Sequence, residues 1–517
     1  MKQRIFLSAV VTLVIASFAC NTVPFLAHAT QTPVPPTATL TATSTPRPTR
    51  TSTPNITDTP EPTETSTPLS SPLPTEENTT GQVAITWFVG LGTGSDPAQV
   101  STEAAVVDKF NASQNHIHLT LQIVKNEEAR DTLKKMIAAG NGPDIIGPVG
   151  WSNANPFEGQ WLDLAPYIKE SGFDTTQFNP ALINMLITEQ GQIALPFAVY
   201  PSSIIYNTKL FDENGLNYPP AQYGQTYKMP NGSQVEWNWN TVRDVARLLT
   251  VDGSGRNATE AGFTKNNINN YGFTWQFEMH PNYWGSYWAG GSMLSPGGSS
   301  GKYKAQIPNA WKASWEWTYD GMWGDQPFMG DASAEGSSRF GSGNPFNSDQ
   351  VAMTIQPIWY ACCMSNLGDW DVAAMPTYNG KVGGRVDQDS FRIWKGTKHP
   401  VEAFQVLAYL VTDAVQDLII GSKSRAAAYG ALPALTADQS EWVTAKRTQF
   451  PWVKNWAVVL AGLNYPDIPS AEGYTPNFEE AWYRGNTFAS LLRTTSGLNL
   501  AQEEQTYASD LTLIFTK

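Results

Sequence analysis

The chain has 517 residues, of which 41% are hydrophobic and 12% aromatic, and it contains 19 tryptophans. This length exceeds one small domain and allows two lobes with separate cores. The formal net charge is -13 and there is no run of Lys or Arg. Recognition of DNA, RNA or anionic lipid is therefore not expected, because phosphate contacts need clustered cations.

The N-terminus predicts an exported protein. A basic start, MKQR, precedes the apolar run IFLSAVVTLVIASFA, which is short for a bilayer span and typical of a secretory signal. Two processing sites remain open. Ala27-His28-Ala29 fits a cleavage site that would make 1–29 the signal peptide, whereas Ser17-Phe18-Ala19-Cys20 resembles a lipobox in which the signal ends at 19 and Cys20 is lipidated. Either way the protein is expected at the cell surface or in the periplasm.

Residues 30–80 are rich in Thr, Pro and Ser, as in TPVPPTATLTATSTPRPTRTSTP. With little apolar surface to bury, this segment is expected to be a disordered, extended stalk. A folded domain is expected from residue 81 to residue 517.

Order begins at residues 83–89, VAITWFV, a β-branched and aromatic run typical of a buried strand. Apolar residues at helical spacing follow at 103–110, and strand alternation returns at 116–124. A second helix at 128–139 ends at Gly140 and leads into a short strand at 144–146. This βαβα order predicts a mostly parallel sheet with helices on both faces. Further strands are expected at 203–206, 351–356 and 372–375, and further helices at 239–249 and 400–412.

The turn Gly90-Leu91-Gly92-Thr93-Gly94 has the context of a dinucleotide-binding loop, between a strand and a helix. The third glycine of that motif would fall at Ser95, and the acidic residue that should follow is missing. A tight turn is the better interpretation. Its backbone N–H groups could face a crevice, because ligands of such sheets bind beyond the carboxyl ends of the strands.

Other chemical motifs are weak. His116 and His118 share one face of a predicted strand, but no third ligand lies near them, so solvent exposure explains them better than a metal does. The loop Asp252-Gly-Ser-Gly-Arg-Asn257 resembles a calcium loop only faintly, because Arg256 would place a cation among the ligands. No nucleophile elbow, zinc-protease or Walker motif is present, and no cofactor is implied; a paired-carboxylate glycosidase stays open because its acids need no fixed spacing.

The stretch YWGSYWAGGSMLSPGG at 283–298 places aromatic residues beside glycines that cannot cover them. A pyranose ring has apolar C–H faces and a polar rim, so a sugar site needs flat aromatic surfaces and a few fixed hydrogen-bonding groups. Packing in a lobe core is the alternative for each of these aromatic side chains.

Five stretches also match one known family in order. They are MIAAGNGPDII at 136–146, LPFAVYPSSIIYNTKLFDENGL at 195–216, VAMTIQPIWY at 351–360, FRIWKGTKHPVEAFQVLAYLVT at 391–412 and PNFEEAWY at 476–483. Together they resemble the extracellular solute-binding proteins of ABC sugar importers, the group that includes maltose-binding protein. The resemblance runs from about residue 81 to the C-terminus, and the segment from Pro219 to Trp239 looks like an insertion without an assigned role.

This resemblance implies the type II periplasmic-binding-protein fold, with two α/β lobes joined by a hinge. The chain is expected to cross between the lobes near 198–205, near 387–391 and again after Thr412. The N-terminal lobe would then cover about 81–198 and 391–412, and the C-terminal lobe about 206–386 and 425–517.

The resemblance also implies the function of a monomeric binding protein that carries a mono- or oligosaccharide to a membrane permease, without catalysis. Trp359 and Trp482 correspond to sugar-stacking aromatics, and Tyr200 and Trp151 stand where the maltose binder has acids. The full set of expected ligand contacts is Trp151, Tyr200, Trp275, Trp284, Trp288, Trp359 and Trp482. A non-sugar solute, a surface adhesin and a glycoside hydrolase are the alternatives.

The pair Cys362 and Cys363 lies in WYACCM, at the predicted cleft end of a strand, and Cys20 is the only other cysteine. Neighbouring thiolates without further ligands do not suggest a metal site, and the C-x-x-C spacing of redox catalysis is missing. Two interpretations remain open: free thiols in a cleft-side turn, or a vicinal disulfide formed after export.

Overall fold

The computed structural model describes residues 81–296, 303–340, 344–364, 366–421, 427–467 and 473–517. The predicted signal peptide, the Cys20 lipidation site and the stalk over 30–80 lie outside the described residues, as does the side chain of Cys362. Those expectations stay predictions.

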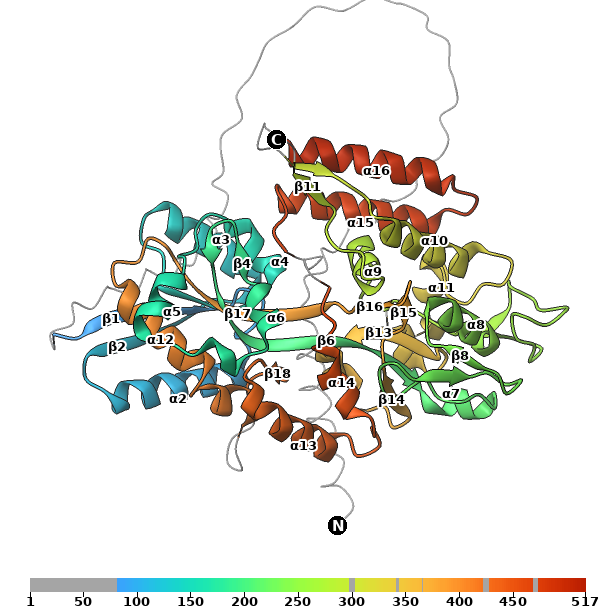
Figure 1. The fold of residues 1–517 in the computed structure, drawn as a ribbon, viewed down its shortest axis with the longest axis horizontal. Helices are drawn as coiled ribbons and strands as arrows, with labels where there is room; N and C mark the ends of the chain where they lie inside the picture. Colours follow the sequence, from blue (N-terminus) through green and yellow to red (C-terminus); the bar gives the residue numbers. More distant parts are fainter. Residues whose placement is uncertain (1–80, 297–302, 341–343, 365, 422–426, 468–472) are drawn as a thin grey trace, which may run out of the picture. The chain divides into compact units, whose positions relative to one another are not determined.

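The first lobe begins with three parallel strands (Figure 1). Strand β1 (Val83–Val89) pairs in parallel with β2 (Ile117–Ile123) on one side and with β3 (Ile145–Val149) on the other. Helices α2 (Pro97–Ser113) and α3 (Asn126–Ala138) connect these strands. The predicted βαβα order is confirmed. Helix α2 begins earlier than predicted because Pro97 suits a first helical turn and the Gln99 side chain accepts a hydrogen bond from the Asp96 amide.

Two long strands carry the chain between the lobes and lie side by side in Figure 1. They are β6 (Leu195–Asn207) and β17 (Val386–Ile393). The first half of β6 pairs with β17 and β18 (Leu432–Pro433), and the second half pairs with β13 (Met353–Pro357) and β14 (Trp370–Ala373). A single strand therefore belongs to the sheets of both lobes, and this makes it the hinge.

The expectation of a mostly parallel sheet is wrong. Among the named strands of the large sheet, parallel pairing is confined to β1 with its two neighbours, and every pair made by β6 or β17 is antiparallel. The reason is the path of the chain: β6 runs from the first lobe into the second, and β17 returns beside it in the opposite direction.

The second lobe surrounds β13 and β14 with helices and small hairpins. Its helices are α7 (Thr208–Glu213), α8 (Trp239–Leu249), α9 (Pro281–Tyr287), α10 (Asn309–Trp323), α11 (Ala332–Glu335), α15 (Phe478–Thr494) and α16 (Leu500–Phe515). Its hairpins are β7 (Thr226–Lys228) with β8 (Gln234–Glu236), β9 (Val251–Asp252) with β10 (Ile268–Asn270), β11 (Leu294–Pro296) with β12 (Tyr303–Ala305), and β15 (Thr377–Tyr378) with β16 (Lys381–Val382). The predicted insertion over 219–239 forms the β7–β8 hairpin and reaches the start of α8.

Shorter elements complete the described chain. They are α4 (Trp151–Ala154), η1 (Asn155–Phe157), α5 (Ala165–Ser171), η2 (Thr175–Gln177), α6 (Pro180–Asn184), β4 (Ile187–Thr188), β5 (Gly191–Gln192), η4 (Ser338–Phe340), η5 (Pro345–Ser348), η6 (Ile358–Met364), α12 (Pro400–Val411), η7 (Gln416–Ile420), η8 (Thr436–Asp438), α13 (Gln439–Gln449) and α14 (Trp456–Gly462). Between α14 and α15 the chain passes the crossing strands once more, where Pro466 bridges to Gly384. The exact lobe boundaries stay a prediction.

The hydrophobic core is divided between the two lobes only in part. One cluster of buried side chains extends from Ile85 through Phe197 to Trp370 and Trp456, and a second fills the helical side of the second lobe. The stretch Pro400–Ile420 is long and apolar enough to cross a membrane, but 56% of its most apolar window is buried inside the protein. Because α12 packs on β17 and β6, it is a core helix of the first lobe.

Candidate ligand-binding site at the lobe junction

Acidic side chains lie where the strands cross between the lobes. Asp387 is opposite Tyr200 in the register of β17 and β6, and the Tyr200 hydroxyl donates a hydrogen bond of 3.1 Å to Asp389 Oδ2. Alternate residues of a strand, and residues opposite each other on neighbouring strands, share one face. The three half-buried side chains therefore form one polar group at the hinge.

Trp359 lies beside this group. It sits in η6, just beyond the end of β13, and its Nε1 donates a hydrogen bond of 3.1 Å to Asp387 Oδ2. The indole is half-buried, with Phe277 at 6.3 Å and Tyr360 at 6.1 Å between ring centres. A partly exposed aromatic ring next to fixed carboxylates is the combination that a sugar ring requires.

A buried ion cluster holds this arrangement from behind. Arg385 pairs with Glu278 and, at 2.7 Å, with Asp387 Oδ1, and its guanidinium lies 3.4 Å from the centre of the Tyr283 ring. The Arg385 and Glu278 side chains are only 6% and 1% exposed. Asp387 thus contacts Arg385 with one oxygen and Trp359 with the other, and it links the buried ion cluster to the indole.

Trp482 contributes an aromatic surface from α15. The His280 ring stacks on it at 3.7 Å and 5°, and a backbone amide, that of Asn282, donates to His280 Nδ1 at 3.2 Å. His280 Nε2 must then carry the proton, which it donates to the Trp482 carbonyl at 3.2 Å. Burial lowers the pKa of His280 to about 3, so this histidine stays neutral and acts as a support for Trp482.

The first lobe meets the junction at the carboxyl ends of its strands, as expected for an open α/β sheet. A Cβ atom on Gly150, just after β3, would lie 3.2 Å from Asp389 Oδ1. The turn after β1 is confirmed as tight, because Gly90, Gly92 and Gly94 all have positive φ. On Gly94 a Cβ would come within 3.0 Å of both Tyr429 Oη and Glu103 Oε1, so only glycine fits there.

Glu103 is a buried acid behind this turn. Its side chain accepts a hydrogen bond from the Tyr429 hydroxyl, and burial raises its pKa to about 7. An unfolded chain would release this proton near the ordinary pKa of 4.5. The folded state therefore binds more protons between those two pH values, and its stability falls as the pH rises. The contribution of Glu103 is complete below about pH 4.5 and is lost as the pH passes about 7.

We expect Glu103→Gln to flatten this pH dependence. Glutamine keeps an acceptor for Tyr429 but has no proton to lose, so the wild-type free energy of unfolding should fall by on the order of 3 kcal/mol more than that of the variant between pH 4.5 and 7.5. Urea denaturation at several pH values measures the difference. Other titrating groups, His280 included, cancel in the comparison.

The matched control is Glu213→Gln, which changes an exposed carboxyl on α7. The free energy of unfolding of Glu213→Gln should depend on pH as that of the wild type does. A Glu103→Gln profile parallel to the wild type would show that Glu103 does not titrate as described.

Trp151, the expected contact from the first lobe, is only 4% exposed. It begins α4 directly after Gly150, and the Arg392 guanidinium lies between its ring and that of Trp161, at 4.8 and 5.3 Å from the ring centres. Burial lowers the pKa of Arg392 to about 9. The structure places Trp151 next to the junction but inside the lobe, and its contact with a ligand stays a prediction.

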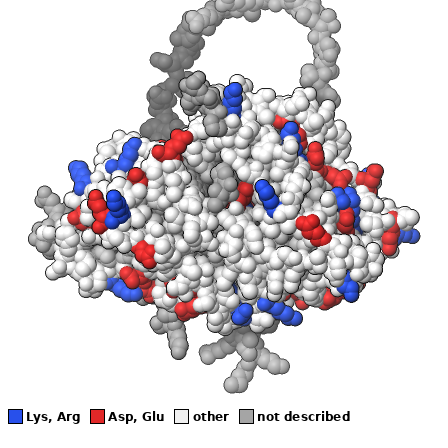
Figure 2. Space-filling view, in the orientation of Figure 1, with Lys and Arg blue, Asp and Glu red and all other residues white. Residues whose placement is uncertain are grey.

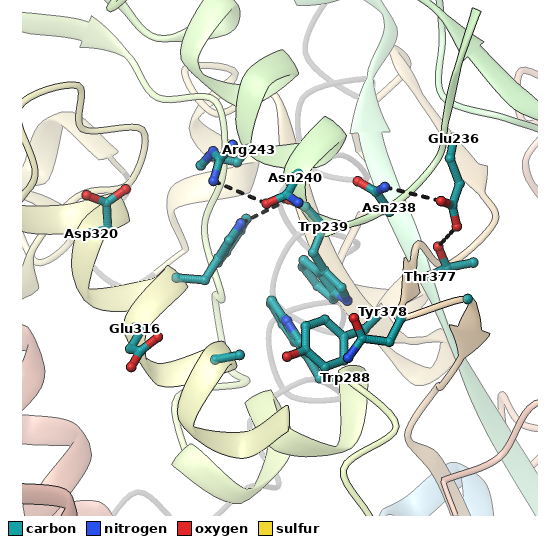
Figure 3. Close-up of a pocket in the computed structure, with 14 residues that line it drawn as sticks. Glu236, Asn238, Trp239, Asn240, Arg243, Trp288, Glu316, Asp320, Thr377 and Tyr378 are labelled. Atoms are coloured by element: carbon teal, nitrogen blue, oxygen red, sulfur yellow. Dashed lines mark hydrogen bonds between the residues drawn. The ribbon is translucent and has the colours of Figure 1, made fainter. Parts of the chain in front are cut away.

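The three expected contacts around the glycine-rich stretch are core residues of the second lobe. Trp275 and Trp284 are 2% and 0% exposed, with Nε1 donating to Thr318 and to the Glu278 carbonyl. Trp288 is 2% exposed, stacks on Trp239 at 3.4 Å, and lines a pocket made of second-lobe residues (Figure 3). The flanking glycines allow this packing, because a Cβ on Gly285 would lie 2.3 Å from the Trp311 ring. The burial of these three side chains does not support their contact with a ligand at the junction.

The cysteine turn lies in η6, the same element as Trp359. Cys363 is disulfide-bonded, and its carbonyl accepts a hydrogen bond of 2.8 Å from the Asn347 side chain. Because the Cys362 side chain lies outside the described residues, the pairing of Cys363 with Cys362 stays a prediction.

The remaining motifs behave as turns and surface residues. Both oxygens of Asp252 accept hydrogen bonds from Ser254, Arg256 and Thr264 at 2.6–3.1 Å, so the carboxylate closes the loop. His116 is exposed. No cluster of three or more His, Cys, Asp or Glu that could hold a metal occurs among the residues that the structure describes. On the face shown in Figure 2, Lys and Arg are scattered among Asp and Glu and form no basic patch.

Sequence reasoning missed the polar half of the junction: Glu278, His280, Arg385, Asp387 and Asp389. The signal was present in the alternation Arg385-x-Asp387-x-Asp389, which puts charged side chains on one face of a strand already expected to cross between lobes. A charged face on a buried crossing strand has few explanations other than a site or an ion cluster.

Comparison with known proteins gives a consistent result. The family model described as bacterial extracellular solute-binding protein matches residues 94–417. No curated protein sequence matches the chain.

Among solved structures, UspC of M. tuberculosis is similar with a TM-score of 0.63 and 17% identity, covering 83% of this chain and 100% of its own. An ABC substrate-binding protein of Listeria monocytogenes in complex with cycloalternan has a TM-score of 0.56 and 16% identity, and the match covers 83% of this chain and 98% of that protein. The cyclic alpha-maltosyl-1,6-maltose binding protein of Arthrobacter globiformis has a TM-score of 0.58 and 14% identity, and the match covers 84% of this chain and 100% of that protein. These likenesses show that the two-lobed architecture is a solute-binding-protein fold.

Proposed function

Because the chain belongs to the bacterial extracellular solute-binding proteins, the substrate-binding components of ABC transporters, we propose that it binds a mono- or oligosaccharide at the lobe junction and delivers it to a membrane permease. The observation that carries this proposal is the group formed by Tyr200, Asp389 and Trp359 on and beside the crossing strands. It combines carboxylate and hydroxyl groups for sugar hydroxyls with an aromatic surface for the C–H faces. The sugars named for the structural neighbours add support.

Binding is proposed to close the lobes. A ligand shifts a hinge only by as much as it prefers the closed state, so it must contact both lobes. Gly150 and Asp389 are on the side of the first lobe, and Trp359 and Trp482 on the side of the second. Ion pairs already join the lobes, since Glu479 of α15 lies 3.1 Å from Arg130 and 3.4 Å from Lys134 of α3.

We assign the ligand contacts to the junction residues that are partly exposed. Tyr200, Asp389, Trp359 and Trp482 meet that condition. Trp151 is proposed to back the site from the first lobe. Trp275 and Trp284 are proposed to act as packing residues, because a side chain with no exposed surface cannot contact a sugar without a rearrangement of its lobe.

The family consists of binding proteins, and we propose no enzymatic activity. The family also implies export. We further propose a monomer that is anchored to the membrane by a lipid on Cys20 and held away from it by the Thr/Pro/Ser-rich stalk over 30–80. A non-sugar solute is the main alternative ligand.

A saccharide ligand should raise the melting temperature. At a concentration about 100 times its Kd, a ligand that binds only the folded state stabilises it by about 2.7 kcal/mol, which corresponds to a Tm increase of about 2–5 °C for a protein of this size. Differential scanning fluorimetry with mono- and oligosaccharides, phosphate, polyamines and peptides measures this. A shift with the other solutes but with no sugar would refute the carbohydrate assignment, and turnover of a glycoside would favour an enzyme.

A further inference from the structure

A pocket lies within the second lobe, away from the crossing strands. The pocket has a volume of about 460 Å³ and is formed by four segments: the N-terminal end of α8 with the residue run before it, Trp288 at the end of α9, one face of α10, and the turn between β15 and β16 (Figure 3). Small-molecule pockets are typically roughly 300–1,000 Å³. All of its lining residues fall between Glu236 and Gly380, so the described residues of the first lobe contribute nothing to it.

The floor of the pocket is formed by packed indoles, of which only small parts reach the surface: Trp239, Trp288 and Trp317 are 3%, 2% and 8% exposed. Trp239 and Trp288 stack at 3.4 Å and 12°, and Trp317 meets both at steep angles, 5.1 and 5.4 Å away. Trp317 Nε1 donates to the Trp239 carbonyl at 3.0 Å. Tyr378, which is half-buried, also lines the pocket.

The rim supplies hydrogen-bonding groups that are not used elsewhere. Among the described residues, no hydrogen bond or ion pair is made by the carboxylate of Glu316, the hydroxyl of Tyr378 or the side-chain amide of Asn379. Glu316 lies on α10, on the opposite side of the pocket from Glu236 and Thr377 (Figure 3). A ligand held between these walls would meet acceptors and donors on several sides.

The charges select the class of ligand. Three carboxylates, of Glu236, Glu316 and Asp320, face one guanidinium, that of Arg243, which argues against an anionic ligand. A cation is also disfavoured. Asp320 is paired with Arg247 at 2.8 Å, Glu236 accepts hydrogen bonds from Asn238 and Thr377, and the two stacked indoles cover each other's faces. The half-buried ring of Tyr378 and an acceptor-rich rim suit a polyhydroxylated ring.

We propose that this pocket is a second carbohydrate site, which binds one neutral saccharide unit independently of lobe closure. The proposal gives a role to two features that the junction does not use. The insertion that ends near Trp239 builds one wall of the pocket, and Trp288 of the glycine-rich stretch forms part of its floor. Because one lobe builds the whole site, occupancy does not depend on the hinge.

The test uses the Trp359→Ala protein, in which saccharide binding at the junction is expected to be weakened about 30- to 100-fold, so that binding at the pocket can be followed separately. Glucose, maltotriose, cellotriose and mannotriose are added one at a time, and saturation-transfer NMR detects binding. We expect at least one saccharide to bind. Ala313→Trp, which places a large side chain inside the pocket from α10, should abolish the signal, whereas the matched Ala313→Ser should keep it.

Milder variants guard against misfolding of the blocked protein. Glu316→Ala removes a rim carboxylate from an exposed helical position, and Asn379→Gly removes the amide while it preserves the positive φ of 49°. Each should weaken binding about tenfold. Near-UV circular dichroism and Tm confirm folding.

The proposal is overturned if none of the four sugars binds, if binding survives Ala313→Trp unchanged, or if only an amine such as spermidine binds in a way that Ala313→Trp abolishes. The proposed function fails separately. If the wild-type protein and the Trp359→Ala protein bind the same sugar equally, and Ala313→Trp abolishes all binding, the pocket stands and the junction does not.

Discussion

Replacing Trp359 with alanine should weaken saccharide binding about 30- to 100-fold and remove the sugar-induced rise in Tm. The indole is the half-buried aromatic surface at the junction, and its Nε1 is fixed by Asp387 at 3.1 Å. An aromatic anchor that is held in place before the ligand arrives typically contributes about 2–3 kcal/mol to binding. Isothermal titration calorimetry measures Kd, and scanning fluorimetry measures the shift.

Two further variants make this test specific. Trp359→Phe keeps an aromatic ring but loses the hydrogen bond to Asp387. Its affinity for the sugar should therefore lie between that of Trp359→Ala and that of the wild type. Trp323→Ala is the matched control, because that indole is also half-buried, with one hydrogen bond of 2.8 Å to the Leu492 carbonyl on the far side of the lobe. It should lower stability but keep the sugar-induced shift. Normal binding by Trp359→Ala would contradict the assignment of the site.

Replacing Arg385 with methionine should lower the free energy of unfolding by about 3–5 kcal/mol, the usual cost of removing one member of a buried ion pair. Methionine fills a similar volume but leaves the buried Glu278 carboxylate without its guanidinium. The same change releases Asp387 from one of its contacts and so loosens the orientation of Trp359. Urea denaturation measures stability, and sugar affinity should fall in parallel.

The double variant Arg385→Met with Glu278→Gln should recover part of the stability, because it removes the uncompensated charge. A matched control is Lys109→Met, whose partner is Asp417 and whose side chain is 58% exposed. An exposed pair of this kind contributes at most about 1 kcal/mol. Equal losses from Arg385→Met and Lys109→Met would show that the buried cluster does not hold the junction.

Local patterns in the sequence predicted the first lobe well. The apolar run at β1, the helical spacing of α2 and the glycine after α3 each depend on neighbouring residues, and local propensity and burial patterns are enough to decide them. The resemblance to solute-binding proteins rested on short stretches in the right order, and the family and fold it implied are confirmed.

The direction of strand pairing could not be obtained in this way. A parallel sheet was expected because β1, β2 and β3 alternate with helices, and among those strands the expectation holds. The antiparallel half depends on where the chain returns after it leaves β6 at Asn207, and it comes back only at Val386, where β17 begins. Local sequence patterns do not predict the pairing of strands that are so far apart in the chain.

The sequence by itself determined that this protein has a two-lobed α/β fold, with more tryptophan than a core of ordinary composition needs. Only the tertiary structure decided which tryptophans can meet a ligand. Trp284 and Trp359 have the same chemistry, but Trp284 is enclosed by α10 and the buried Glu278 segment, whereas Trp359 stands at the end of a strand between two lobes. The physical reason is that exposure depends on what packs against a side chain, and those partners come from segments far away in the sequence.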